Sequence, residues 1–165
     1  KEIKLKKKLG ITSGYLLDAK TNKKNYNRKN RPWGAATLYT KECLSDIGGF
    51  THGFSHTTIE IILANKMKYE TSQNSTTYFT HLRAVSEKYG FYKGYYQNGI
   101  AAKWLGMPLT FSIIKAIKLG VSKNPIKGIA FILGYLRWKG KMCQNETVKN
   151  TNKNKWKIWL RRNNI

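Results

Sequence analysis

The chain has 165 residues, of which 31 are Lys or Arg and 8 are Asp or Glu, so its formal net charge is +23. With 41% hydrophobic and 13% aromatic residues, the chain is too rich in core-forming side chains to be a disordered basic tail. No apolar stretch approaches the roughly 18 residues of a membrane-spanning helix. The only cysteines, Cys43 and Cys143, lie far apart, which excludes a disulfide scaffold or a zinc ribbon.

The positive charge is unevenly distributed along the chain. Residues 1–31 carry a net charge of +9, residues 32–100 carry +1, residues 101–140 carry +7 and residues 141–165 carry +6. The middle of the chain therefore resembles an ordinary globular protein with basic segments on either side. A nucleic-acid-binding protein more often carries basic residues throughout its folded part.

The elements of the middle segment have clear boundaries. Residues 33–40 are small and apolar, which suits a buried strand or tight packing. Thr40 is a good N-cap for a short helix that Gly48-Gly49 ends, with an apolar face made of Cys43, Leu44 and Ile47. Apolar residues at helical spacing predict a second helix over 57–67, which Ser55, Thr57 or Thr58 would cap.

A strand and three further helices are expected after this point. Residues 75–81 are rich in Thr and aromatic residues, which favours a strand, and Ser86 is expected to begin a helix. Residues 108–120 place isoleucines on one side of a helix. Asn124 followed by Pro125 is typical of a helix start, and it opens an apolar helix over 125–141.

The ordered set of motifs in residues 33–90 resembles the family 2 glycosyltransferases. In that family a small-residue strand is followed by a helix, a GGF turn, an acidic pair that opens a second helix, an extended segment and an H-x-R motif. Gly48-Gly49-Phe50 matches the turn, residues 57–67 match the second helix, and His81-Leu82-Arg83 match H-x-R. The resemblance covers roughly 55 residues, and it implies the C-terminal half of a catalytic domain with the GT-A fold.

This resemblance gives the expected fold class and domain organisation. The fold class is α/β, as an α+β fragment in which a partial GT-A domain is followed by helices. Residues 1–90 would form the domain half, 91–141 a basic helical region and 142–165 a basic Lys/Asn-rich tail. The family's nucleotide-binding half with its Asp-x-Asp motif has no counterpart here, so the resemblance implies a truncated or degenerate hexosyltransferase, and the Lys1 start favours truncation.

The acidic pair of the family has no carboxylate counterpart in this sequence. Its position falls on Ser55-His56 or His56-Thr57, and in the family one of these carboxylates looks like the base that deprotonates the acceptor hydroxyl. His56 could serve as this base, and so could Glu60, about one turn further along the helix. The alternatives are that His56 is a plain loop or capping residue and that Glu60 only interacts favourably with the helix dipole.

Further site residues are assigned by the resemblance alone. It implies that His81 helps to hold a divalent metal, Mg²⁺ or Mn²⁺, in the full-length enzyme, although a polar residue at a strand end is an equal alternative. It also places Trp33, Gly34 and Arg83 in substrate binding. The implied substrates are a nucleotide-sugar donor and a glycan or lipid-linked acceptor. We expect the fragment alone to be inactive.

The basic C-terminal part suggests a further partner. Residues 108–141 combine apolar helix faces with only positive charge, which is typical of helices that lie on an anionic membrane surface. We therefore expect a cytoplasmic protein, with a peripheral position on the inner face of the cell membrane as an option. Helices that pack on the catalytic domain are the alternative reading. A rival function, that of a basic nucleic-acid-binding module, would use the lysines with interleaved tyrosines and tryptophans.

Overall fold

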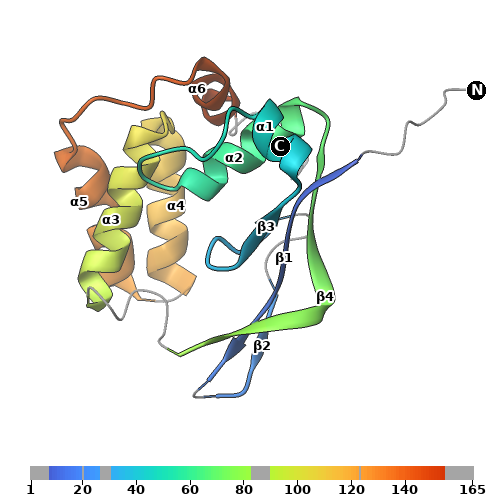
Figure 1. Ribbon diagram of the computed structural model, residues 1–165. Coiled ribbons are helices and arrows are strands. Elements are labelled where there is room, and N and C mark those ends of the chain that lie inside the picture. The colour runs from blue at the N-terminus through green and yellow to red at the C-terminus, as the bar shows by residue number, and fades with distance from the viewer. Residues whose placement is uncertain (1–7, 20, 27–30, 83–89, 123, 155–165) are drawn as a thin grey trace, which may run out of the picture. The chain divides into compact units, whose positions relative to one another are not determined.

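The computed structural model describes residues 8–19, 21–26, 31–82, 90–122 and 124–154 (Figure 1). Contacts between residues divide the chain into two compact units, residues 1–84 and residues 85–165. The first unit contains a sheet and two helices, and the second contains helices in its described part. The protein is therefore a mixed α/β molecule, as the sequence predicts.

The first unit is built on a long central strand, β1 (Leu9–Asp18). The short strands β2 (Lys24–Asn25) and β3 (Thr37–Tyr39) pair antiparallel with different stretches of β1. The last strand, β4 (Glu70–His81), runs parallel to β1 from Leu9 to Asp18, with shifts of register after Leu9 and Ser13. The sheet is thus mixed, and its parallel pair requires a crossover connection.

Two helices lie in this connection. Helix α1 (Lys41–Asp46) begins at Thr40, whose hydroxyl accepts a hydrogen bond of 3.3 Å from the amide of Cys43. Gly48 and Gly49 follow the helix with φ of 83° and 84°, the left-handed region in which glycine is favoured. Helix α2 (His56–Lys66) then leads back to the start of β4.

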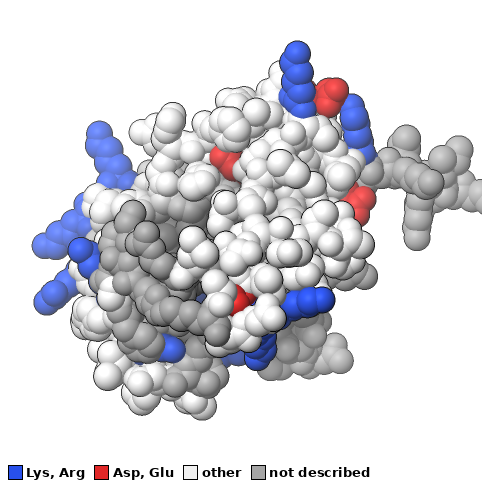
Figure 2. All heavy atoms as spheres, turned by 60° about the horizontal axis from the view of Figure 1, so that its bottom comes forward, with Lys and Arg blue, Asp and Glu red and all other residues white. Residues whose placement is uncertain are grey.

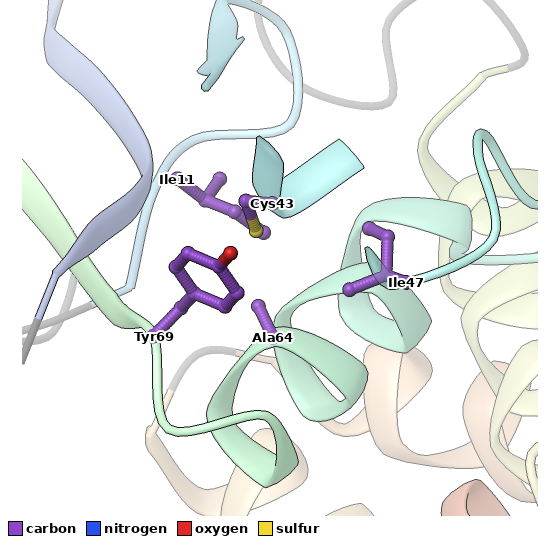
Figure 3. Packing of buried hydrophobic residues seen from close by; sticks show 5 residues of the cluster. All are labelled: Ile11, Cys43, Ile47, Ala64 and Tyr69. Atoms are coloured by element: carbon purple, nitrogen blue, oxygen red, sulfur yellow. The ribbon is translucent and has the colours of Figure 1, made fainter. Parts of the chain in front are cut away.

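The core of the first unit joins the sheet to both helices. Ile11 of β1, Cys43 of α1 and Ala64 of α2 are fully buried, and Ile47 and Tyr69 are buried beside them (Figure 3). The expectation that Cys43 is a core residue is confirmed. Strand β1 was not predicted from the sequence.

The second unit consists of α3 (Phe91–Trp104), α4 (Leu109–Ser122), α5 (Pro125–Arg137) and α6 (Glu146–Lys153). The predicted start of α5 is confirmed, because the side chain of Asn124 accepts a hydrogen bond of 2.9 Å from the amide of Ile126. The predicted helix start at Ser86 lies outside the described residues, and the described helix begins at Phe91. No helix in the described ranges is both long and apolar enough to cross a membrane.

Glycines allow the helices of the second unit to approach one another closely. A Cβ atom on Gly99 of α3 would collide with the carbonyl oxygen of Phe131 in α5, and one on Gly134 would collide with the carbonyl oxygen of Tyr96. The backbones of α3 and α5 are therefore in direct contact at two places. Phe131 is fully buried between the helices, and the hydroxyl of Tyr135 donates a hydrogen bond of 2.6 Å to the carbonyl of Met107.

Candidate functional site

Two of the predicted site residues, Gly34 and His56, lie at the N-terminal end of α2. His56 is the first residue of this helix, and its side chain is exposed. Ser55 precedes it in the left-handed conformation, with φ of 57°, and its side chain makes no capping hydrogen bond. Of the three residues expected to cap the helix, Ser55 therefore occupies the N-cap position, but its side chain does not cap the helix.

Residues 31–34 reach the same end of α2. The guanidinium of Arg31 donates a hydrogen bond of 3.2 Å to the hydroxyl of Thr58. The Cα of Gly34 faces Thr57 so closely that an added Cβ would lie 2.9 Å from the Thr57 hydroxyl oxygen. The structure thus brings Gly34, a predicted substrate-binding residue, next to the helix turn that begins at His56, and it adds the positive charge of Arg31.

Trp33 lies in a turn that β1 and β3 fix in place. Its backbone amide donates a hydrogen bond of 2.8 Å to the hydroxyl of Ser13, and its carbonyl accepts one of 2.7 Å from the hydroxyl of Thr37. Its indole Nε1 atom is buried and has no hydrogen-bond partner among the described residues. The indole is a donor that a bound polar group could satisfy.

The other candidate base, Glu60, is fully buried. Its carboxylate accepts a hydrogen bond from the hydroxyl of Tyr39, at the end of β3. It also accepts one of 3.1 Å from the amide of Thr51 and one of 3.3 Å from the Thr51 hydroxyl. A buried carboxylate needs such donors, because an unpaired charge away from water is costly.

These contacts show what Glu60 does in the fold. They hold the beginning of the 51–55 loop against α2 and β3, and this loop leads directly to His56. The Thr51 hydroxyl also lies 3.4 Å from the carbonyl oxygen of His56. Burial, together with the hydrogen bond to Glu60, raises the pKa of Tyr39 well above its usual value. Tyr39 therefore remains a proton donor to Glu60 at neutral pH.

The predicted metal and phosphate ligands are only partly described. The backbone of His81 ends β4 opposite Asp18 of β1, but its side chain lies outside the described part of the chain, as does all of Arg83. Across the described ranges, no three His, Cys, Asp or Glu side chains are grouped so that they could hold a metal ion. The described residues do not by themselves fit a divalent metal, and no step proposed below uses one.

Sequence reasoning missed the contacts that join these elements. Neither the contacts of Tyr39 and Thr51 with Glu60 nor that of Arg31 with Thr58 was predicted from the sequence. Tyr39 and Thr51 lie 21 and 9 positions from Glu60 along the chain, and Arg31 lies 27 positions from Thr58. None of these separations follows a helical or strand period. The only sign of these contacts in the sequence was the position of Tyr39 near the end of an apolar stretch.

Comparisons with known proteins give no further guide to this site. No protein-family model matches the chain, and neither a curated protein nor a solved structure is significantly similar to it.

Proposed function

We propose that the chain is part of a glycosyltransferase that moves a sugar from a nucleotide-sugar donor to a glycan or lipid-linked acceptor. The observation that carries this proposal is the order of elements in the first unit. A short strand, a capped helix, a Gly-Gly-Phe turn, a second helix and a strand that ends at His81 follow one another, as the resemblance to the family 2 enzymes implies. A partial GT-A domain is the corresponding proposal for the fold.

The arrangement around α2 supports this assignment. Gly34 and His56 come from separate segments and lie at the same end of the helix, and Trp33 directly precedes Gly34. Arg31 adds a positive charge there, which suits the diphosphate of a nucleotide-sugar. The buried Nε1 of Trp33 adds a hydrogen-bond donor.

His56 is the better candidate for the base. Its side chain is exposed, whereas both oxygens of the Glu60 carboxylate already accept hydrogen bonds. In the proposed reaction the acceptor oxygen attacks the anomeric carbon of the donor and its proton passes to the His56 imidazole. The nucleoside diphosphate leaves with the electron pair of the broken bond. Glu60 would act as a positioning residue, through the loop that precedes His56.

The sequence contains no Asp-x-Asp motif, so we expect the 165-residue chain alone to be inactive. The test is to express the chain together with the coding sequence upstream of Lys1 and to assay it with a panel of nucleotide-sugars and membrane-extracted acceptors. We expect transfer from one donor, and we expect His56→Ala to lower kcat about 100-fold or more. The absence of transfer from every donor would overturn the proposal.

His52 provides a matched control. It lies in the loop that leads to His56, four positions earlier in the chain, and its side chain is also exposed. His52→Ala should leave kcat within about twofold of the parent enzyme, because the proposal gives this side chain no proton to move. If transfer occurs but both His56→Ala and Glu60→Gln leave turnover unchanged, neither residue is the base.

A further inference from the structure

Helices α4 and α5 form a groove on the surface of the second unit. Its volume is about 460 Å³, and its lining contains only Ile, Val, Ala, Gly and Pro residues. Six of them project from the two helices: Ile113, Ile117, Val121, Pro125, Ile129 and Ile132. A groove with this lining offers no aromatic ring on which a base could stack and no side-chain hydrogen-bond donor.

The groove lies next to the core of the second unit, because Ala116 belongs to both and Ile132 packs against the core. Ile113, Ile117 and Val121 are four residues apart and therefore lie on one stripe of the helix, with exposed fractions of 42%, 60% and 86%. Ala116 is buried in the lining of the groove, and Ser112 is fully buried. On α5, Ile129 is 55% exposed although its neighbours Ala130 and Phe131 are fully buried. The exposed apolar side chains thus form a face that adjoins the core and extends beyond it into solvent.

The charge around this face has one sign. Residues 101–140 contain seven basic residues and no acidic residue. Lys118 projects from α4, and Arg137 and Lys139 are exposed at the end of α5. Figure 2 shows basic side chains that extend into solvent at several places on the face that it draws, with acidic side chains also present on that face. An occupant of the groove must therefore be apolar and must be accompanied by negative charge.

This requirement excludes two occupants that the chain itself could supply. Residues 142–165 contain apolar residues near their end, but their net charge is +5. A second copy of the groove would bring another exclusively basic surface against the first, and like charges at short distance repel. Neither of these two occupants supplies negative charge to balance the basic residues around the groove.

We infer that the exposed face of α4 and α5 inserts into the interfacial region of a bilayer that contains anionic lipids. The isoleucines and Val121 would lie at the boundary between head groups and acyl chains, and the lysines would contact phosphate groups. Each basic residue near an anionic surface strengthens binding about fivefold. This inference concerns the second unit alone and does not depend on sugar transfer by the first.

The test is binding of the full chain to vesicles without any nucleotide-sugar, so its failure is separate from a failure of the transferase proposal. We expect at least tenfold stronger binding to vesicles with 40% phosphatidylglycerol than to pure phosphatidylcholine. The variant Ile117→Asn/Val121→Asn should reduce binding about tenfold or more. Both side chains are exposed, so the variant should fold like the parent, which circular dichroism will check.

A control variant and a probe of depth complete the experiment. Leu38→Asn removes an equally exposed apolar side chain, 69% exposed, from β3 and should leave binding unchanged. Ile117→Cys can be labelled with the fluorophore NBD, because both native cysteines are buried, and its emission should shift to the blue on anionic vesicles. Binding that is absent, independent of anionic lipid or unaffected by Ile117→Asn/Val121→Asn would overturn the inference, as would binding to an oligonucleotide but not to vesicles.

Discussion

The hydroxyl of Tyr39 donates a hydrogen bond to the buried carboxylate of Glu60. Tyr39 ends β3 and Glu60 lies in the second turn of α2, so the pair joins the sheet to the helix that begins at His56. Thr51 supplies two further donors to the same carboxylate. The position of the loop before His56 therefore depends on a single buried acid.

Replacement of this acid should destabilise the first unit. Glu60→Gln keeps the shape of the side chain but replaces one accepting oxygen by an amide group, which donates. One of the donors from Tyr39 or Thr51 then loses its acceptor, at a cost of about 2 kcal/mol in the free energy of unfolding. Urea denaturation followed by circular dichroism measures this difference.

Glu70 provides the control for this substitution. It is the first residue of β4, and its side chain is exposed. Glu70→Gln should change the free energy of unfolding by less than about 0.5 kcal/mol, because substitutions at exposed sites are usually nearly neutral. Equal effects of Glu60→Gln and Glu70→Gln would contradict a structural role for the Glu60 carboxylate.

The stability of the first unit should also fall at high pH. The hydroxyl of Tyr69 donates a hydrogen bond of 2.6 Å to the carboxylate of Asp46. This bond, with burial and the nearby charge of Asp46, raises the pKa of Tyr69 to about 12. Between pH 10 and pH 12 the unfolded chain releases this proton while the folded chain keeps it, so stability that is complete below pH 10 is lost as pH rises.

The measurement is the urea midpoint at pH 9.5 and at pH 11, for the parent and for Tyr69→Phe. The decrease between the two values should be smaller in Tyr69→Phe, which has no proton to lose at this position. Tyr78→Phe removes a tyrosine hydroxyl that is exposed in β4, and this control should behave like the parent. The same decrease in all three proteins would show that the Tyr69–Asp46 pair has no part in the pH dependence.

The features that could be predicted from sequence are those set by neighbouring residues. Thr40 and Asn124 cap their helices through amides two or three positions away, and Gly48-Gly49 ends α1 through its own backbone angles. These preferences depend on one residue and its immediate surroundings. For this reason the order of elements over residues 37–81 follows the prediction closely.

The features that were missed depend on residues far apart in the chain. β1 pairs with β4 about 60 positions away, and its sequence is not rich in β-branched residues, so its strand state is set by the sheet around it. From the sequence, Glu60 is a candidate base or a carboxylate that interacts favourably with the helix dipole, yet it is fully buried and bonded to Tyr39 of the sheet. Its burial follows from where Tyr39 and Thr51 lie in space, which no spacing rule encodes.

The close approach of α3 and α5 predicts a strong effect of small substitutions. In Gly99→Ala or Gly134→Ala, the added methyl group would lie on a carbonyl oxygen of the facing helix, that of Phe131 or Tyr96. The helices must separate to accept it, and overpacking of this kind costs about 1–3 kcal/mol. Thermal denaturation should show a lower Tm for each variant.

Gly120 of α4 is the matched control, because an added Cβ there would meet its nearest neighbour, the Cα of Pro125, at 3.7 Å. This is an ordinary van der Waals contact. Gly120→Ala should therefore raise the stability by up to about 1 kcal/mol, since alanine is the better helix former. A loss of stability in Gly120→Ala as large as in Gly99→Ala would contradict the assignment of the loss to the contact between α3 and α5.

Lys68 offers a substitution that should stabilise the first unit. It follows the C-terminal end of α2 with φ of 65°, in the left-handed region that glycine occupies without strain. Its side chain is exposed, so its removal disturbs no core contact. Lys68→Gly should therefore increase the free energy of unfolding by about 0.5–1 kcal/mol. This is the usual cost of a residue with a Cβ in this conformation, reduced by the greater flexibility of glycine in the unfolded chain.

The control is Lys66→Gly, two positions earlier at the last residue of the helix, which should lower the free energy of unfolding by up to about 0.5 kcal/mol. Opposite signs for the two variants in urea denaturation would support the left-handed conformation of Lys68, and a loss of stability in both would contradict it.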